Sequence, residues 1–126
     1  MREILFKAKR IDNGEWVEGY LFKTQENTYI AYNNQFDDDL FLSPPNIFIV
    51  IDEKTICQYT GLTDKNGCKI WENDIMKYVW DGKECIDVIE YQEPIFTYSN
   101  SFRWSLYEDE VIGNIFDNPE LLERGD

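Results

Sequence analysis

The chain has 126 residues, which suits one ordinary domain, and its 25 Asp and Glu residues against 12 Lys and Arg residues give a formal net charge of −13. It contains no histidine, which excludes a Ser-His-Asp triad, a Cys-His dyad and a zinc site with imidazole ligands. The strong negative charge argues against a protein that is held on nucleic acid by neutralising phosphates.

The N-terminal part of the chain alternates between apolar and polar residues, as half-buried β-strands do. This alternation covers residues 4–8 and returns over 16–22. Between them lies Asp12-Asn13-Gly14, and Asn-Gly tolerates the positive φ angles that tight hairpin turns require. We therefore predict a β-hairpin over the first 23 residues, followed by a third strand over 28–32.

The longest unbroken apolar run is Ile47–Ile51, which follows a Pro-Pro loop. A run that is apolar on both faces is either a fully buried strand or a strand covered by a partner chain. Both interpretations stay open from the sequence. Ile47, Phe48 and Ile49 are accordingly candidates for an interaction surface.

The C-terminal part continues the same pattern of short strands. Turn signals at 64–67 and 81–82 flank alternating segments at 75–80 and 85–91. We also expect one or two strands within 98–107 and a last strand over 111–116.

Only the end of the chain has helical character. Asn118 is suited to cap a helix and Pro119 to its first position, so one or two helical turns are expected there. The predicted fold class is mainly β, a small barrel or sandwich of short antiparallel strands with a short C-terminal helical turn. The expected organisation is a single domain over 1–126, with possible sub-halves 1–54 and 55–126.

The composition also bears on the compartment. The three cysteines are widely spaced, which is typical of reduced thiols in a cytoplasmic protein. The first residues contain no apolar segment typical of a secretory signal, and no apolar run approaches the length of a membrane span. We therefore expect a cytoplasmic protein that does not contact membranes.

Two motifs are recognisable as a pair. Residues 58–75 read QYTGLTDKNGCKIWENDI, and residues 111–122 read VIGNIFDNPELL. In this order and at this separation they resemble the YopX family of bacteriophage and prophage proteins, and the opening residues 2–8 resemble the usual start of that family. Asn73 stands where the family usually has Gly, and Asn is the residue best able to replace Gly at positive φ.

The resemblance implies a small phage or prophage protein in a bacterial host cell, with an SH3-like barrel in its C-terminal half and a plausible homo-oligomeric state. It supplies no catalytic residue, because the family is functionally uncharacterised. The residue types within the two motifs have a complete structural explanation as turns and strand ends, and we favour that scaffold role over a site.

Acidic clusters are the remaining candidates for interaction. Asp37-Asp38-Asp39 is the densest run, and Glu108-Asp109-Glu110 begins a C-terminal segment rich in acids. Carboxylates can hold Mg²⁺ or Ca²⁺, but neither run has the spacing of a calcium loop. We expect no catalytic, metal or cofactor site and no enzyme activity, and a carboxylate metal enzyme is the alternative that we disfavour.

Three functional hypotheses follow. The first is an accessory protein that acts through protein–protein contacts, as a homo-oligomer or with a host protein. The second is an acidic mimic of DNA that inhibits a host DNA-binding protein. The third, which the net charge disfavours, is a nucleic-acid-binding barrel, and it would need a local basic face built from these residues: Lys7, Lys9, Arg10, Lys23 and Lys54.

Overall fold

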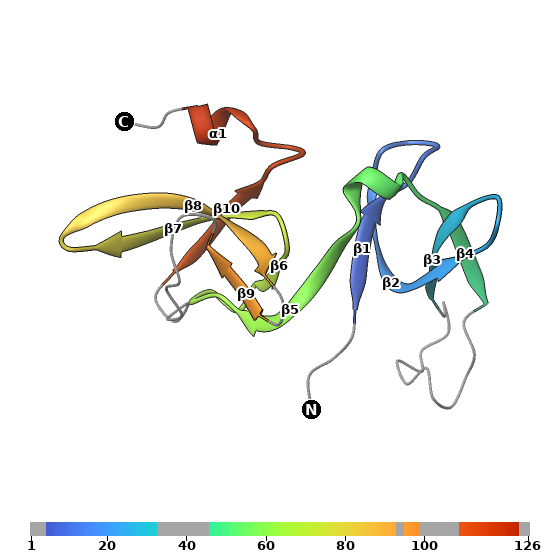
Figure 1. The fold of residues 1–126 in the computed structure, drawn as a ribbon, viewed down its shortest axis with the longest axis horizontal. Helices are drawn as coiled ribbons and strands as arrows, with labels where there is room; N and C mark the ends of the chain where they lie inside the picture. Colours follow the sequence, from blue (N-terminus) through green and yellow to red (C-terminus); the bar gives the residue numbers. More distant parts are fainter. Residues whose placement is uncertain (1–4, 33–45, 93–94, 99–108, 124–126) are drawn as a thin grey trace. The chain divides into compact units, whose positions relative to one another are not determined.

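The computed structural model describes residues 5–32, 46–92, 95–98 and 109–123. Over these residues the fold is mainly β, with antiparallel pairing throughout and one short helix, as the sequence predicts (Figure 1). The chain divides into two compact units, residues 1–58 and 59–126. In the described residues no helix is long and apolar enough to cross a membrane.

A six-stranded antiparallel sheet has the order β4-β3-β2-β1-β5-β6, and its strands up to the start of β5 form the N-terminal unit. The bounds of its elements are β1 Phe6–Lys9, β2 Trp16–Lys23, β3 Thr28–Tyr32, β4 Ile47–Val50, the 3₁₀ turn Glu53–Thr55 and β5 Cys57–Thr63. The predicted hairpin is confirmed, because β1 pairs with β2 from Phe6 opposite Gly19 to Lys9 opposite Trp16. Gly14 in the connecting turn has the expected positive φ of 75°.

This sheet closes on itself. Residues just after β1 and β4 form a bridge between Arg10 and Ile51, and the Ile11 N–H donates to the Val50 carbonyl over 3.1 Å. The 3₁₀ turn then leads the chain back to β1, where Cys57 pairs with Lys7. Closure satisfies backbone groups that an open sheet edge would leave exposed.

The core of this unit lies inside the closed sheet. Ala8, Ile30 and Ile51 are buried there, with Ile49 among the partly buried side chains packed against them. Ile30 stands directly opposite Ile49 on one side and Leu21 on the other. Alternation along each strand therefore assigns one face of the sheet to the core.

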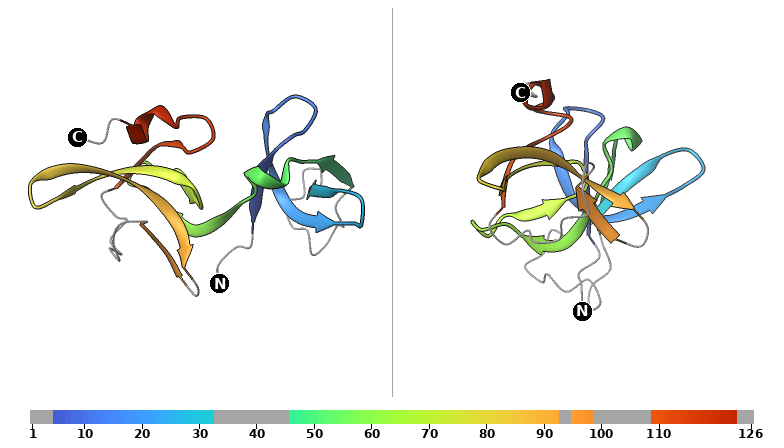
Figure 2. Two further views of the ribbon diagram at one scale, coloured as in Figure 1. Left: turned by 45° about the horizontal axis from the view of Figure 1, so that its top comes forward. Right: turned by 60° about the vertical axis from the view of Figure 1, so that its left-hand side comes forward.

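The C-terminal unit contains a four-stranded sheet in the order β10-β7-β8-β9. Its elements are β6 Lys69–Trp71, β7 Asp74–Trp80, β8 Lys83–Gln92, β9 Ile95–Tyr98, β10 Glu110–Asn114 and α1 Glu120–Glu123. The second part of β5 pairs with β6 in this unit, with Tyr59 opposite Trp71. Figures 1 and 2 show β7 and β8 as a long curved hairpin, and Ile70, Met76 and Ile89 form the buried cluster.

The structure refines several predicted elements. Strands β5 and β6 lie where the sequence predicts no strand. The helical turn begins at Glu120, just after Pro119, as the sequence predicts. Strand β9 ends at Tyr98, where the predicted strands over 98–107 would begin, and the rest of that segment lies outside the described residues.

A truncation in the N-terminal core tests this packing. Replacing the fully buried Ile30 with Ala should lower the free energy of unfolding by about 2–5 kcal/mol, because it removes packed methyl groups and leaves a cavity. Leu21, which faces Ile30 but is 39% exposed, is the matched control. Leu21→Ala should cost clearly less in the same urea titration, and equal losses would contradict the assignment of Ile30 to the core.

Candidate functional site

The apolar run 47–51 divides between two faces of the N-terminal sheet. Ile49 packs against the core and Ile51 is buried, with 3% of its surface exposed. Phe48 points to the other face and is 48% exposed. The core interpretation thus holds for Ile49 and Ile51 but not for Phe48, since successive side chains of a strand point to opposite sides.

Phe48 belongs to a cluster of three rings that we call the aromatic patch, formed by Phe22, Tyr29 and Phe48. The Phe22 and Phe48 ring centroids are 5.5 Å apart, and Tyr29 lies 6.3 Å from each of them. Strand register brings the rings together. Phe22 is paired with Tyr29, and Phe48 is paired with Ala31, which lies two residues after Tyr29 and therefore on the same face of the sheet. Phe22 is also 48% exposed, so the patch presents apolar surface to solvent.

The acidic residues named as candidates differ in whether the structure describes them and in how far they are buried. Asp37, Asp38, Asp39 and Glu108 lie outside the described residues. Asp109 is completely buried, so placing it on an exposed interaction surface was wrong. It directly precedes Glu110, which pairs with Lys77 at the start of β10. Glu110 is partly buried, and its carboxylate lies 3.8 Å from the Lys65 ammonium group.

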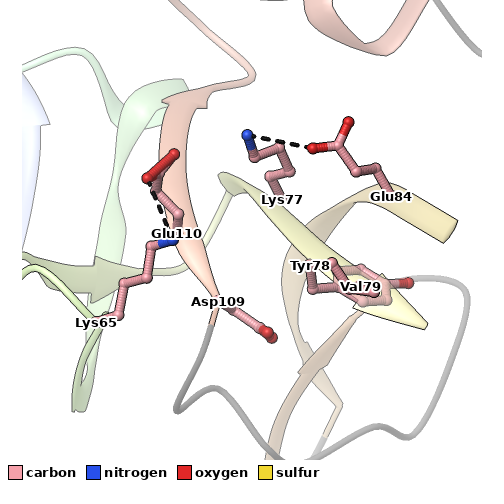
Figure 3. Close-up of a pocket in the computed structure, with 7 residues that line it drawn as sticks. All are labelled: Lys65, Lys77, Tyr78, Val79, Glu84, Asp109 and Glu110. Atoms are coloured by element: carbon pink, nitrogen blue, oxygen red, sulfur yellow. Dashed lines mark ion pairs between the residues drawn. The ribbon is translucent and has the colours of Figure 1, made fainter. Parts of the chain in front are cut away.

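Asp109 and Glu110 line a cavity of about 450 Å³ in the C-terminal unit (Figure 3). The cavity could not be predicted from the sequence, because its lining comes from separate segments of the chain. The other lining residues belong to the Asp64–Gly67 turn and to β7 and β8. Lys65 contributes from the turn, and Lys77 with Glu84 forms a second ion pair of 3.5 Å. Tyr78 and Val79 complete the wall described by the structure.

The first sequence motif contains a carboxylate, that of Asp64, whose hydrogen-bond donors are all backbone N–H groups. Asp64 Oδ1 accepts hydrogen bonds from the N–H groups of Asn66 and Cys68, both over 2.9 Å, and Oδ2 accepts from the Val111 N–H over 3.0 Å. Burial of the carboxylate opposes its ionisation, but these three N–H donors outweigh burial and hold the pKa of Asp64 below its ordinary value. The side chain therefore joins the first motif to the second.

The two motifs meet again at Asn73. Its φ of 72° lies in the left-handed region, where Asn substitutes for Gly. The Asn73 N–H donates to the Ile89 carbonyl, and the Asn73 carbonyl accepts from the Ile115 N–H. Backbone hydrogen bonds thus tie this turn to β8 on one side and to the residue after β10 on the other.

The end of the second motif is a turn built by asparagines. Asn114 Oδ1 accepts from the N–H groups of Phe116 and Asp117, and Asn118 Oδ1 accepts from the Asn114 N–H. Gly113 is required because a Cβ there would come within 2.5 Å of Asn118 Oδ1. The described contacts of both motifs are structural, consistent with the expected scaffold role.

The described residues contain no group of three or more His, Cys, Asp or Glu side chains able to hold a metal ion. Of the candidates for a basic face, Lys7 and Lys9 lie over the Trp16 ring at 4.6 and 5.5 Å, and Arg10 forms an ion pair with Asp12.

Removing the Asp64 charge should destabilise the protein in a pH-dependent manner. Asn can offer only one acceptor oxygen, so Asp64→Asn leaves a buried N–H unpaired and should cost about 1–3 kcal/mol near neutral pH. Because folding lowers the pKa of Asp64 from its ordinary 3.8, its stabilisation is complete well above that value and is lost as the pH falls through the lowered pKa.

Urea unfolding at a series of pH values measures this effect. The difference between the wild type and Asp64→Asn should be constant at neutral pH and shrink in acid. Glu120→Gln, at an exposed position of α1, is the control and should change stability by less than about 0.5 kcal/mol. A difference that stayed constant into strong acid would show that the charge is not responsible.

The family model for the YopX protein matches residues 5–123. The crystal structure of protein EF1440 from Enterococcus faecalis is similar in fold, with a TM-score of 0.61 and 24% sequence identity over 97% of this chain and 99% of that one. None of the curated proteins compared with the chain matches it.

Proposed function

The chain belongs to the YopX protein family, and from this premise we propose that it is a phage or prophage accessory protein that acts in the bacterial cytoplasm through protein–protein contacts. It works without catalysis and forms a homo-oligomer through the aromatic patch. The observation that carries the proposal is the clustering of Phe22, Tyr29 and Phe48 on the sheet face opposite the core.

Electrostatics favour the aromatic patch as the place where two copies meet. Each copy carries a formal charge of −13, so the copies repel one another. A contact made of uncharged rings adds no carboxylate to the interface, and charges farther away than about 8 Å are largely screened at physiological salt. Added salt should therefore strengthen this self-association.

The size of the patch sets the expected strength. An aromatic side chain buries about 150–250 Å², and two of the three rings are half exposed. The patch is then smaller than the roughly 800 Å² per partner of a standard interface. We expect weak association, with a dissociation constant in the micromolar range or above.

A DNA mimic remains the second candidate. Its acidic surface would come from the exposed carboxylates of the C-terminal unit, such as Glu84, Asp117, Glu120 and Glu123. Asp64, Asp74, Asp87 and Asp109 are buried and cannot act as phosphate mimics. Binding by a mimic weakens as salt is added, which is opposite to the salt effect expected for the aromatic patch.

Two substitutions in adjacent residues of β4 test the homo-oligomer. Phe48→Asp should convert the assembly to monomers with little loss of stability, since the ring lies outside the core. Ile49→Asp should unfold the N-terminal unit, because it places a charge against the buried cluster. Light scattering at several protein concentrations, with circular dichroism and urea unfolding, measures both effects.

Ile11→Asp is the matched control, because Ile11 is apolar and 68% exposed in the same unit but outside the aromatic patch. It should leave the assembly intact. A wild-type protein that is strictly monomeric at high micromolar concentration would overturn the proposed self-association.

A further inference from the structure

We propose that the tip of the β7–β8 hairpin of one copy docks on the aromatic patch of a second copy, so that the copies assemble head-to-tail. The inference rests on the proposed self-association through the aromatic patch and names the surface that this patch meets. We call residues 77–86 the hairpin arm. The arm exposes apolar side chains and carries no net charge, although it belongs to a strongly acidic unit.

The hairpin arm projects from the body of its unit. Burial decreases steadily along β7, since residues 74–76 are buried, 77–78 are half-buried and 79–80 are exposed. Residues 81–84, which form the turn and the start of β8, are exposed as well. Figure 1 and the left view of Figure 2 show this turn away from the other strands of the unit. The arm is therefore accessible to another molecule.

Both faces of the arm expose apolar side chains. Strand register places Val79 and Ile86 on one face as diagonal neighbours, and Trp80 on the other face. Their exposed fractions are 60%, 41% and 63% respectively. A two-stranded hairpin has no second layer of its own to cover such side chains, and apolar side chains that gather at the surface are typical of a contact with another protein.

The charge of the arm differs from that of its unit. Residues 59–126 contain 15 Asp and Glu residues against six Lys and Arg residues, which gives a formal charge of −9. The arm contains two acids and two lysines, and Lys77 forms an ion pair with Glu84 over 3.5 Å. The arm thus suits a partner that is itself acidic, as a second copy of this chain is, because it adds no uncompensated carboxylate to the contact.

Contact between arm and patch covers more apolar surface than contact between two patches. The patch alone is smaller than the roughly 800 Å² per partner of a standard interface. Trp80 adds a ring of the size that buries about 150–250 Å² and can pack edge-to-face against the rings of the patch. If two patches met instead, the arm of each copy would stay exposed, and if two arms met, the patch would.

The distribution of charge also favours the aromatic patch over a second arm as the surface that the arm meets. Two arms in contact would bring together two units of charge −9. Residues 1–58, which carry the patch, contain ten Asp and Glu residues against six Lys and Arg residues, so their formal charge is only −4. A head-to-tail contact leaves one patch and one arm unused at the ends, so assembly continues to a ring or a filament instead of ending at a dimer.

Mixing two variants of the full chain tests the proposal. Phe48→Asp disrupts the patch and keeps the arm, whereas Trp80→Glu disrupts the arm and keeps the patch. Each variant alone should associate at least about tenfold more weakly than the wild type, as loss of a central aromatic contact does. An equimolar mixture should form 1:1 dimers that grow no further, because one intact patch and one intact arm remain. Analytical ultracentrifugation measures the masses.

The arm variants are chosen to keep the hairpin folded. Trp80 is paired directly with Lys83, so the new carboxylate of Trp80→Glu lies opposite a lysine, which is a favourable cross-strand pair. Ile86→Asp, opposite Lys77, is a second arm variant and should behave as Trp80→Glu does. Circular dichroism and urea unfolding establish that each variant is folded. Leu122→Glu adds the same charge at a 40% exposed position of α1 and should assemble as the wild type does.

The outcomes separate this inference from the proposed function. Dimers in the mixture of two monomeric variants support docking of the arm on the patch. Assembly of a folded arm variant to the same extent as the wild type, or a mixture that stays monomeric, would overturn arm docking and leave self-association through the patch in place. Assembly of Phe48→Asp to the wild-type extent, or a strictly monomeric wild type, would overturn both proposals.

Discussion

The Asp64 carboxylate accepts hydrogen bonds from three backbone N–H groups, two in its own turn and one at Val111, which lies 47 residues further along the chain. Two of these groups close the turn that leads into β6, and the third belongs to Val111 in β10. A single buried side chain thus orders a turn and fixes where a distant strand begins. The cavity depends on the same arrangement, because Lys65 in that turn is paired with Glu110, the residue just before Val111.

The alternation of apolar and polar residues was sufficient to predict strands that have one buried and one exposed face. The alternation in β1, β2, β7 and β8 follows from one face packing on a core and the other meeting solvent, and these strands form where they were expected. Strand β5 lacks that signal, because Thr60, Gly61 and Thr63 are small or polar. It is held by pairing with the distant β1 and, across the turn at 64–67, with β6, and neither pairing leaves a periodic trace in its own residues.

The candidate sites, too, could be predicted only in part from the local sequence. Phe48 was identified within its apolar run, but the association of Phe22 and Tyr29 with it depends on strand register, which alternation alone does not determine. The acid-rich segment from Glu108 onward favoured a solvated surface, yet Asp109 is buried. Whether a carboxylate is buried depends on tertiary packing, so composition could not distinguish the buried Asp109 from exposed carboxylates later in the chain such as Asp117 and Glu120.

Strand β4 has a consequence for how such proteins diverge. Odd-numbered residues such as Ile49 and Ile51 contribute to the core, and the even-numbered Phe48 contributes to the exposed face. Under the proposed self-association through the aromatic patch, selection for stability therefore acts on one set of positions and selection for binding on the set between them. A lineage can change what this surface recognises by substitutions at alternate positions of one short strand, while the packing of the unit that carries the strand is kept.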